Sequence, residues 1–504
     1  MGPRPLRLLP LLLVILASLY AAAADRESAS TATRSEAVQA ARESYRASER
    51  IDPAEFPIGV FDSGTGGLAV LEAILAIDAF DNATHGPAAG GDGKADFGEE
   101  SFIFLADQAN MPYGNYPSVG KQAYLEDLIV KDAEFLLGDK HFAHAEAEPA
   151  RGKAPVKAIV IACNTATAYG KDDIEQMVAD AGLTVPVIGV VDAGARGAVD
   201  VFADGRSGTI GVLATRGTVL SEAYPRAIRA EAARRGLTHR IDVVQQGSLG
   251  LAGAIDGIRE FVVPGSEIRR PREAYQGPSL DHPLARIDRG ILRRYGFDFS
   301  EGRMLFQGPP DQPDELQLNS VENYLRYDLV ALLENLRKSP RAGPLRAVVL
   351  GCTHFPYYAE TFRRELKRLR DYREGGAYPY RDCMAPSVAW IDPARFTARE
   401  LHRRLVEEKR FDRTVEDPLS PTRGEFFITV PCRKCPAVEL TAQGQFAHEY
   451  KYGRKREDVG ADFRPVPLRP RELDPQTAQR LQSQLPAVWK LLGEFNERNG
   501  KAKP

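Results

Sequence analysis

The sequence predicts an α/β fold with parallel sheets, arranged as two half-related units. Three observations support this prediction. Short apolar runs rich in Val and Ile recur along the chain and end in small or polar residues, as buried parallel strands do. Helical patterns follow most of these runs. Two of the runs also end alike, at Cys163 and Cys352, which indicates an internal repeat.

The predicted strands and helices alternate along most of the chain. Ile-Gly-Val recurs before Asp62, Asp192 and Ala214, which is modest support for a duplication. The predicted strands cover 57–64, 101–107, 158–162, 186–192, 209–215, 347–351 and 425–430. The predicted helices include 66–75, 221–235 and an amphipathic helix at 475–497.

The two cysteines follow predicted strands in equivalent contexts. One strand leads into Cys163-Asn164-Thr165 and the other into Cys352-Thr353-His354. Ligands of open α/β sheets bind at the carboxyl ends of the strands, so both thiols are expected at one site. Two thiols that face a small molecule from opposite sides can invert a carbon stereocentre by moving a proton. The pattern therefore predicts a racemase or epimerase.

Each of these residues also has a plain structural interpretation. A free cysteine often packs as a small hydrophobic residue, but the shared context of Cys163 and Cys352 favours a function. His354 could be structural, yet its position after Cys352 and Thr353 suits a proton relay. Asp62 follows a buried strand and could be either a functional carboxylate or a capping residue of the glycine-rich turn.

The N-terminus resembles an export signal. Arg4 and Arg7 precede an apolar stretch at 8–20, and Ala22-Ala23-Ala24 resembles a cleavage site. The stretch is short for a membrane anchor, so we expect a signal peptide at 1–24, cleavage, no membrane contact afterwards, and an exported, periplasmic protein. A polar linker or helix is expected at 25–56.

The net charge argues against a nucleic-acid partner, and the three cysteines outside the two strand motifs need separate interpretations. The 504-residue chain has a formal net charge of −3, which gives no case for nucleic acid. Cys432 and Cys435 form a lone C-x-x-C that is compatible with a disulfide or with half of a metal site. No second pair of ligands stands at zinc-like spacing, so we expect no metal. Cys383 lacks a strand-and-turn context and is expected to be non-catalytic.

Several motifs in order resemble the aspartate/glutamate racemase superfamily, and glutamate racemases in particular. The resemblance covers most of 57–453, apart from three expected surface insertions at 81–99, 141–155 and 263–320. The motifs are Ile58–Leu68, Ala106-Asp107 through Met111–Gly114, Ala162–Ala166, Pro186–Ala195, Thr215–Tyr224 and Leu350–Pro356.

The resemblance implies two pseudo-symmetric α/β domains with the active site in the cleft between them. It implies Cys163 and Cys352 as the catalytic bases, assisted by Asp62 and His354, and no cofactor. Asp256 is an auxiliary acid that would replace a glutamate of the family. The substrate would be an amino acid, and a homodimer remains open. The implied substrate-binding residues are Ser63, Pro112, Tyr113, Gly114, Asn164, Thr165 and Thr353.

The resemblance also implies domain boundaries. Domain A would cover 57–192 and be completed by about 372–455, and domain B would cover 193–371 with the insertion at 263–320. A helical tail would occupy 456–504.

Substrate identity rests on particular residues. The Asp62-Ser63-Gly64 opening and the Cys352-Thr353-His354 ending resemble glutamate racemases and favour glutamate over aspartate. Two features depart from the family: the loosely aligned segment 244–256, and the signal peptide, because cell-wall precursors are made in the cytoplasm. A racemase of aspartate or another amino acid, and an inactive exported amino-acid-binding protein, are the alternatives.

Overall fold

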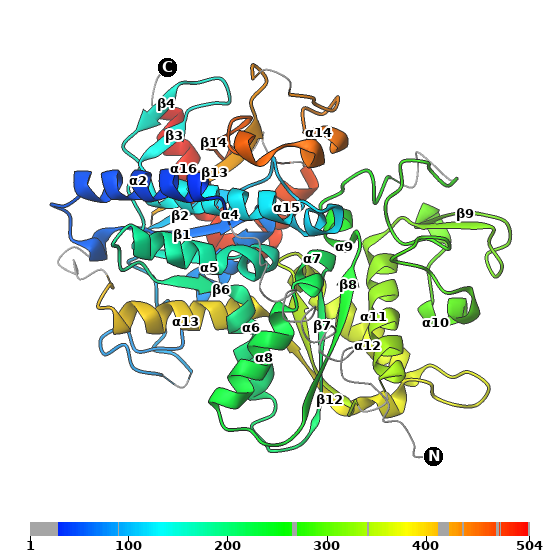
Figure 1. Ribbon diagram of the computed structural model, residues 1–504. Coiled ribbons are helices and arrows are strands. Elements are labelled where there is room, and N and C mark those ends of the chain that lie inside the picture. Colours follow the sequence, from blue (N-terminus) through cyan, green and yellow to red (C-terminus); the bar gives the residue numbers. More distant parts are fainter. Residues whose placement is uncertain are drawn as a thin grey trace, which may run out of the picture.

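The predicted α/β class is confirmed by a computed structural model of the chain. The structure describes residues 29–88, 90–264, 270–339, 342–411, 423–435, 438–469, 473 and 475–501. Within these ranges, a six-stranded sheet and a four-stranded sheet form two halves, and helices cover both faces of each sheet (Figure 1). We refer to them as the first and second sheets.

The first sheet has the strand order β14-β13-β2-β1-β5-β6. β1 is central and pairs in parallel with both β2 and β5, so that Ile58 lies opposite Phe102 on one side and Ala158 on the other. All residues of β1 are buried, which explains its uninterrupted apolar sequence before Asp62. The strands are β1 (Ile58–Asp62), β2 (Phe102–Ala106), β5 (Ala158–Ile161), β6 (Val187–Gly189), β13 (Gly424–Pro431) and β14 (Phe463–Pro467).

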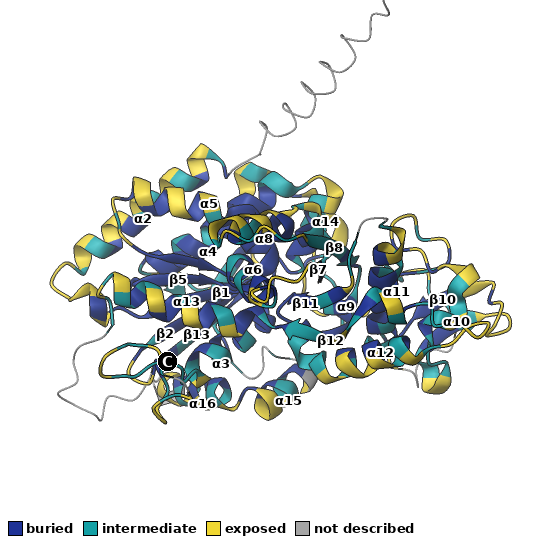
Figure 2. Cartoon of the chain, turned by 90° about the horizontal axis from the view of Figure 1, so that it is seen from below, coloured by how far each residue is buried: buried dark blue, intermediate teal, exposed yellow. Residues whose placement is uncertain are grey.

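Alternate side chains of the first sheet contact different helices. Val60 and Phe104 belong to the core beneath α3, α13 and α16, whereas Phe61 and Leu105 belong to the core beneath α4 and α5. Helix α2 packs outside α4 and α5, and its outer face is exposed (Figure 2). These helices are α2 (Thr31–Ala47), α3 (Leu68–Ala76), α4 (Gln122–Leu137), α5 (Asn164–Asp180), α13 (Pro393–Glu407) and α16 (Pro486–Lys501).

The second sheet has the order β12-β11-β7-β8, and all its pairs are parallel. Its strands are β7 (Gly208–Thr215), β8 (Ile241–Ser248), β11 (Leu345–Gly351) and β12 (Met384–Ile391). One face packs on α6 (Val190–Asp200) and α8 (Ala223–Arg234), and the other on α11 (Val321–Lys338) and α12 (Ala359–Asp371). Because α6 also packs on α13 and α5, it joins the two halves.

Every predicted strand is present, and the ends agree within two residues in all strands but one. The predicted run 186–192 is divided, since β6 ends at Gly189 and α6 begins at Val190. Strands β8, β12 and β14 were not predicted. Each lies at an edge of its sheet, where half-exposed strands do not show a continuous apolar run.

Two of the predicted boundaries and the expectation of wholly parallel sheets need correction. The chain does not return to the first half at 372, because β12 pairs with β11 in the second sheet; it returns with α13, which packs on α3, and then β13. The segment 456–504 is not only helical, since β14 pairs with β13. This pairing is antiparallel, so the first sheet is not wholly parallel.

The segments outside the two sheets are more ordered than a linker or surface loops would be. Residues 31–47 form α2, whose Ala37 and Ala41 are fully buried. The expected helix at 475–497 is divided into α15 (Pro475–Gln484) and α16, separated at Leu485. The insertion at 141–155 forms the hairpin of β3 (Lys140–Phe142) and β4 (Pro149–Arg151).

The insertion at 263–320 is not only a surface segment. It contains α10 (Leu292–Tyr295) and a hairpin of β9 (Met304–Gln307) and β10 (Glu315–Leu318). Ile287 and Leu316 are fully buried in the core formed with α11. The insertion therefore contributes to the hydrophobic core of the second half.

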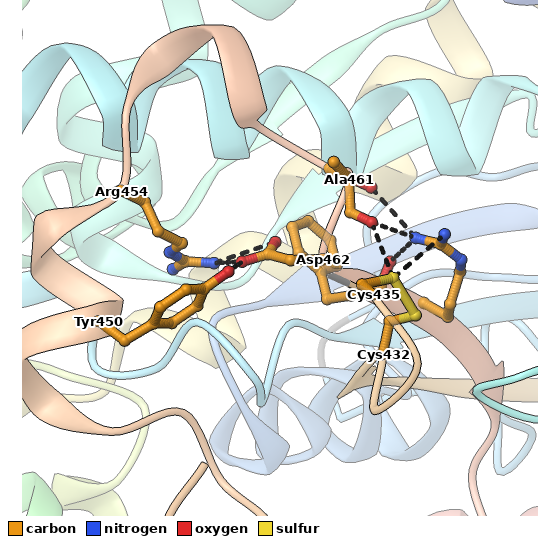
Figure 3. The surroundings of a disulfide bond; sticks show 9 residues. Cys432, Cys435, Tyr450, Arg454, Ala461 and Asp462 are labelled. Carbon is orange, nitrogen blue, oxygen red and sulfur yellow. Dashed lines mark hydrogen bonds and ion pairs between the residues drawn. A yellow bond between two sulfur atoms is a disulfide. The ribbon is translucent and has the colours of Figure 1, made fainter. Parts of the chain in front are cut away.

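Cys432 and Cys435 form a disulfide, which resolves the two interpretations of the C-x-x-C (Figure 3). The bridge lies just after β13, beside the loop that leads to β14. There Arg454 and Tyr450 of the α14 region (α14, His448–Gly453) converge on Asp462. Arg454 also donates to Asn110 Oδ1, so this region supports the loop that precedes Pro112.

The predicted signal peptide at 1–24 lies outside the described residues. None of the helices in the described ranges combines the length and the apolar character that a bilayer crossing needs.

Candidate active site

The candidate residues lie where the strands of both sheets end. Asp62 is the last residue of β1, and Cys163 follows the neighbouring β5 as the N-cap of α5. In the second sheet, Thr215 ends β7, and Cys352 follows the neighbouring β11. Since parallel strands present their carboxyl ends at one edge, each sheet contributes a thiol together with adjacent polar side chains.

Cys163 is enclosed by the first half. Its Sγ lies 3.6 Å from Ser63 Oγ and accepts a hydrogen bond of 3.4 Å from the backbone N–H of Ala166. The residue is 6% exposed. Burial, together with the nearby negative charge of Asp62, raises the pKa of the Cys163 thiol above its ordinary value. Cys163 therefore holds a proton at neutral pH in this arrangement.

Asp62 is almost completely buried beside that thiol. Its Oδ2 accepts a 2.7 Å hydrogen bond from the backbone N–H of Gly67, and Thr353 Oγ1 lies 3.4 Å from the same oxygen. Its Oδ1 is buried and has no hydrogen-bond partner in the part of the chain that the structure describes. Burial raises the pKa of Asp62 despite the opposing charge of His354. The carboxyl group is thus poised to accept or hold a proton.

Cys352 is the first member of a line of polar contacts in the second half. Its Sγ lies 3.5 Å from His354 Nδ1, and His354 Nε2 lies 2.8 Å from Asp256 Oδ2. Burial alone lowers the pKa of His354, but the ion pair with Asp256 outweighs burial and raises the pKa well above its ordinary value. Asp256, the C-cap residue of α9 (Leu251–Ile255), therefore contacts His354 directly.

The two thiol environments are connected through Thr353. Its hydroxyl oxygen lies 3.4 Å from Asp62 Oδ2 and 3.4 Å from His354 Nδ1. Asp62 and His354 come from different halves, so this contact closes the site between the two sheets. The side chains are close-packed: the cavity beside Cys352, which Asn164, Thr353 and Asp392 help to line, measures about 10 Å³, about the volume of one water.

Hydroxyl and amide groups join the halves on the Cys163 side. The hydroxyl oxygens of Thr165, Thr215 and Thr218 lie 3.0 Å from one another, and Asn164 Oδ1 accepts a 2.6 Å hydrogen bond from Tyr224. Thr215, Thr218 and Tyr224 were not among the predicted site residues. Their only sequence signal was membership of the motif Thr215–Tyr224.

Pro112, Tyr113 and Gly114, which the sequence predicted to bind substrate, have different surroundings. The Tyr113 hydroxyl lies 2.5 Å from Asp107 Oδ2 and 2.7 Å from Asp132 Oδ2, and Tyr113 is 1% exposed. These contacts hold the Tyr113 side chain inside the first half. Pro112 follows a cis peptide bond, and Gly114 lies against Gly217, where an added Cβ on Gly217 would meet the Gly114 backbone.

A larger cavity lies away from these residues. It measures about 370 Å³ and is lined by α5, α6, α8 and α13, with Lys171, Arg196 and Glu231 among its charged groups. Lys171 pairs with Glu175 and Arg196 with Glu400, so these cations already have partners. The candidate acid–base groups lie instead at the carboxyl ends of the strands.

Part of the chain is similar to a known protein family. Residues 138–255, which include Cys163, the threonine cluster and β8, match the family model described as Asp/Glu/Hydantoin racemase. Over this segment the chain is similar to that family. The match includes strands of both sheets, but Asp62, Cys352 and His354 lie outside it, and it ends one residue before Asp256.

Several curated proteins that are similar to this chain are named glutamate racemase. The protein from Limosilactobacillus fermentum is 32% identical over 216 residues, which are 42% of this chain and 63% of the relative. The protein from Methylococcus capsulatus is 33% identical over 218 residues, with the same coverage of 42% and 63%. The protein from Levilactobacillus brevis is 37% identical over 176 residues, or 35% of this chain and 48% of the relative. The match thus spans less than two thirds of these relatives.

Solved structures of glutamate racemases are also similar to the chain. The enzyme from Bacillus anthracis is 21% identical with a TM-score of 0.42, covering 74% of this chain and 88% of that chain. The enzyme from Francisella tularensis, solved in complex with D-glutamate, is 19% identical with a TM-score of 0.40, covering 80% and 95%.

Proposed function

We propose that the chain is a cofactor-independent amino-acid racemase that interconverts L-glutamate and D-glutamate with Cys163 and Cys352 as its two bases. One observation carries the proposal: two buried thiols follow equivalent strands of the two sheets, and Asp62, Thr353 and His354 connect their surroundings. A thiol suits both removal and return of a proton near neutral pH.

The reaction requires only a proton transfer at each face of the α-carbon. One cysteine, as a thiolate, removes the α-proton, and the electron pair of the C–H bond remains on the carbon as a carbanion. The opposite cysteine, as a thiol, donates its proton to the other face. The product is the other enantiomer, and the two sulfurs have exchanged protonation states, so the reverse reaction starts from the product state.

Asp62 and His354 supply different assistance to the two thiols. The free Oδ1 of Asp62 can accept a proton from Cys163 or a hydrogen bond from the substrate ammonium group. His354 Nδ1 can exchange a proton with Cys352, while Asp256 holds the other ring nitrogen. The two faces of the substrate therefore meet a carboxyl-assisted and an imidazole-assisted thiol.

The substrate carboxylates have suitable partners nearby. The N-terminus of α5 begins at Asn164, and helix N-termini favour anionic groups. Hydroxyl groups of Ser63, Thr165 and Thr353 can donate to the same groups. The names of the curated relatives support glutamate as the substrate, in agreement with the Asp62-Ser63-Gly64 and Cys352-Thr353-His354 motifs. We also propose export to the periplasm, on the basis of residues 1–24.

The decisive experiment is α-proton exchange of L-glutamate and D-glutamate in D2O, followed by NMR, with racemisation followed by polarimetry. The full chain is used with reductant, beside Cys163→Ala, Cys352→Ala and the control Cys383→Ala. Cys383 is free and half-buried outside the site, so its variant should match the wild type. We expect exchange by the wild type, and loss of racemisation in each of the other two variants with at most one-sided exchange.

Other results would redirect the proposal. Exchange with aspartate or another amino acid, but not with glutamate, would retain the two-thiol chemistry and change the substrate. Racemisation that survives both Cys→Ala substitutions would exclude the thiols as bases. Binding without exchange of any amino acid would indicate an exported amino-acid-binding protein.

A further inference from the structure

Arg480 lies beside the active-site histidine although it belongs to the C-terminal segment, far outside the racemase motifs. Its Nη2 lies 3.0 Å from Asp256 Oδ1, and its Nη1 donates a 2.9 Å hydrogen bond to the carbonyl oxygen of Ile255. The side chain of Arg480 is 11% exposed, that of Asp256 8% and that of His354 5%. The guanidinium is therefore an interior part of this site.

Helices α15 and α16 hold Arg480 from the other half of the molecule. Leu481 and Val488 are fully buried in the core beneath α3. The carboxylate of Glu72, on α3, accepts hydrogen bonds of 3.2 and 2.8 Å from the backbone N–H groups of Ala487 and Val488. The helix pair is thus anchored on the first half, while Arg480 reaches Asp256 in the second half.

We propose that Arg480 is a positioning residue for the Asp256–His354 pair, so that the C-terminal helices complete the Cys352 side of the active site. This inference rests on the proposed racemase function. Asp256 uses one oxygen for His354 and the other for Arg480, which leaves the carboxylate little freedom to rotate. A fixed carboxylate in turn orients the imidazole whose Nδ1 lies 3.5 Å from Cys352 Sγ.

Arg480 also contributes charge. Burial raises the pKa of Asp256, but the charges and hydrogen bonds of His354 and Arg480 outweigh burial and lower it below its ordinary value. Removing the guanidinium should therefore raise the pKa of Asp256. The charged and titratable groups that face the pair are Arg480 from α15, Tyr357 from the 3₁₀ helix Phe355–Tyr358, Asp62 from β1, and Cys352.

Two variants of the full chain, Arg480→Gln and Arg480→Lys, distinguish the effect of the Arg480 charge from the effect of its hydrogen-bond geometry. The lysine variant keeps the charge but replaces the planar fork that contacts Asp256 and Ile255 together. Arg498→Gln is the matched control, because Arg498 Nη2 donates a 2.8 Å hydrogen bond to the Gly424 carbonyl and so supports the same helix pair without touching the site. The readouts are α-proton exchange from each glutamate enantiomer against pH, and the pH titration of the His354 ring by NMR.

We expect Arg480→Gln to slow exchange from one enantiomer by about tenfold and to move the acidic limb of kcat/KM to higher pH. The low-pH inflection of the His354 signal, which reports Asp256, should move in the same direction. Arg480→Lys should slow exchange from the same enantiomer but leave the acidic limb of kcat/KM at its wild-type pH. Arg498→Gln should change neither the exchange rate nor the pH of this limb.

The inference would be overturned if both Arg480 variants exchanged the α-proton with the wild-type rate and pH dependence. It would also be overturned if Arg498→Gln changed the exchange rate and its pH dependence as Arg480→Gln does. A wild-type chain that exchanges no amino acid would overturn the proposed function instead. The His354 titration then decides the role of Arg480 alone: a shifted inflection in Arg480→Gln supports it, and an unshifted one overturns it.

Discussion

His354 Nε2 lies 2.8 Å from Asp256 Oδ2, and the other ring nitrogen faces the Cys352 sulfur. Cys163, in contrast, faces the carboxyl group of Asp62. The two thiols therefore occupy chemically different environments, although they follow equivalent strands. Substitutions of the assisting groups should consequently affect exchange from the two enantiomers unequally.

Asp256→Asn should slow exchange through Cys352 by about 10²-fold, because general acid–base assistance contributes on that order. The carboxylate is what raises the pKa of His354 against the effect of burial, so the variant should lower this pKa. NMR titration of the ring, assigned with His354→Gln, checks this direction. An unchanged His354 titration would show that the pair does not interact as described.

Asp256→Asn should also lower the stability of the fold in a pH-dependent way. A raised folded-state pKa of His354 stabilises the fold at pH values below the unfolded pKa of about 6.5, and this contribution is lost as pH rises through the folded pKa. The lowered pKa of Asp256 stabilises the fold above about pH 3.9 and is lost on acidification. The thermal midpoint of Asp256→Asn should therefore fall furthest below that of the wild type between these limits.

Asp62→Asn should have opposite effects on catalysis and on thiol reactivity. Exchange through Cys163 should fall by roughly 10² to 10⁴-fold, since the assisting carboxyl group is lost. Alkylation of Cys163 should nevertheless accelerate at a given pH, because the charge of Asp62 no longer raises the thiol pKa. Iodoacetamide labelling with peptide mapping measures the second effect, and Cys383 serves as the internal reference. Slower labelling would mean that Asp62 activates the free thiol.

Tyr113→Phe should reduce stability more than substrate affinity. The hydroxyl can donate to only one of the two carboxyl groups that it contacts, so Asp132, whose pKa burial raises well above its ordinary value, is the protonated donor to Tyr113. Loss of the shared hydroxyl should cost about 1–3 kcal/mol and lower the thermal midpoint. Tyr450→Phe, which removes a single hydrogen bond to the Asp462 carboxylate, is the control. An increased KM with unchanged stability would support the direct substrate contact that the sequence predicted.

The residues that the sequence predicted are those with local signals. Asp62 ends a buried strand, and Cys163 and Cys352 each follow one. A continuous apolar run that ends in a polar residue is visible without any knowledge of tertiary structure. The proximity of Asp62 and Cys163 was also predictable, because β1 and β5 are neighbouring parallel strands that share one carboxyl edge. The Asp256 prediction rested on a loose alignment, and its contact with His354 now gives it a geometric basis.

The remaining features depend on long-range packing. Arg480 is 224 residues from Asp256 in the chain, and an arginine on an amphipathic helix carries no sequence signal for a buried ion pair. The edge strand β12 contains Pro386 and exposed positions, so neither its pattern nor its composition indicated a strand. Tyr113 was assigned from a motif, but the motif does not reveal that Asp107 and Asp132 occupy its hydroxyl.

Asp328→Asn tests a buried carboxyl group that the proposed reaction does not use. Asp328, on α11, accepts a 3.2 Å hydrogen bond from Gln246, and its Oδ2 has no partner among the described residues. Burial raises its pKa to about 7. Because this folded-state pKa exceeds the unfolded value of about 3.9, the wild type should lose stability as pH rises from about 4 to 7, by up to about 4 kcal/mol.

Asparagine resembles the protonated carboxyl group, so Asp328→Asn should lack this loss and become more stable than the wild type near pH 7, with similar stability near pH 4. Thermal midpoints across this range measure the difference. Asp371→Asn, at a side chain that is 58% exposed, should follow the wild-type curve. Parallel curves for wild type and Asp328→Asn would mean that Asp328 ionises in the folded protein without an energetic cost, and that water reaches its Oδ2.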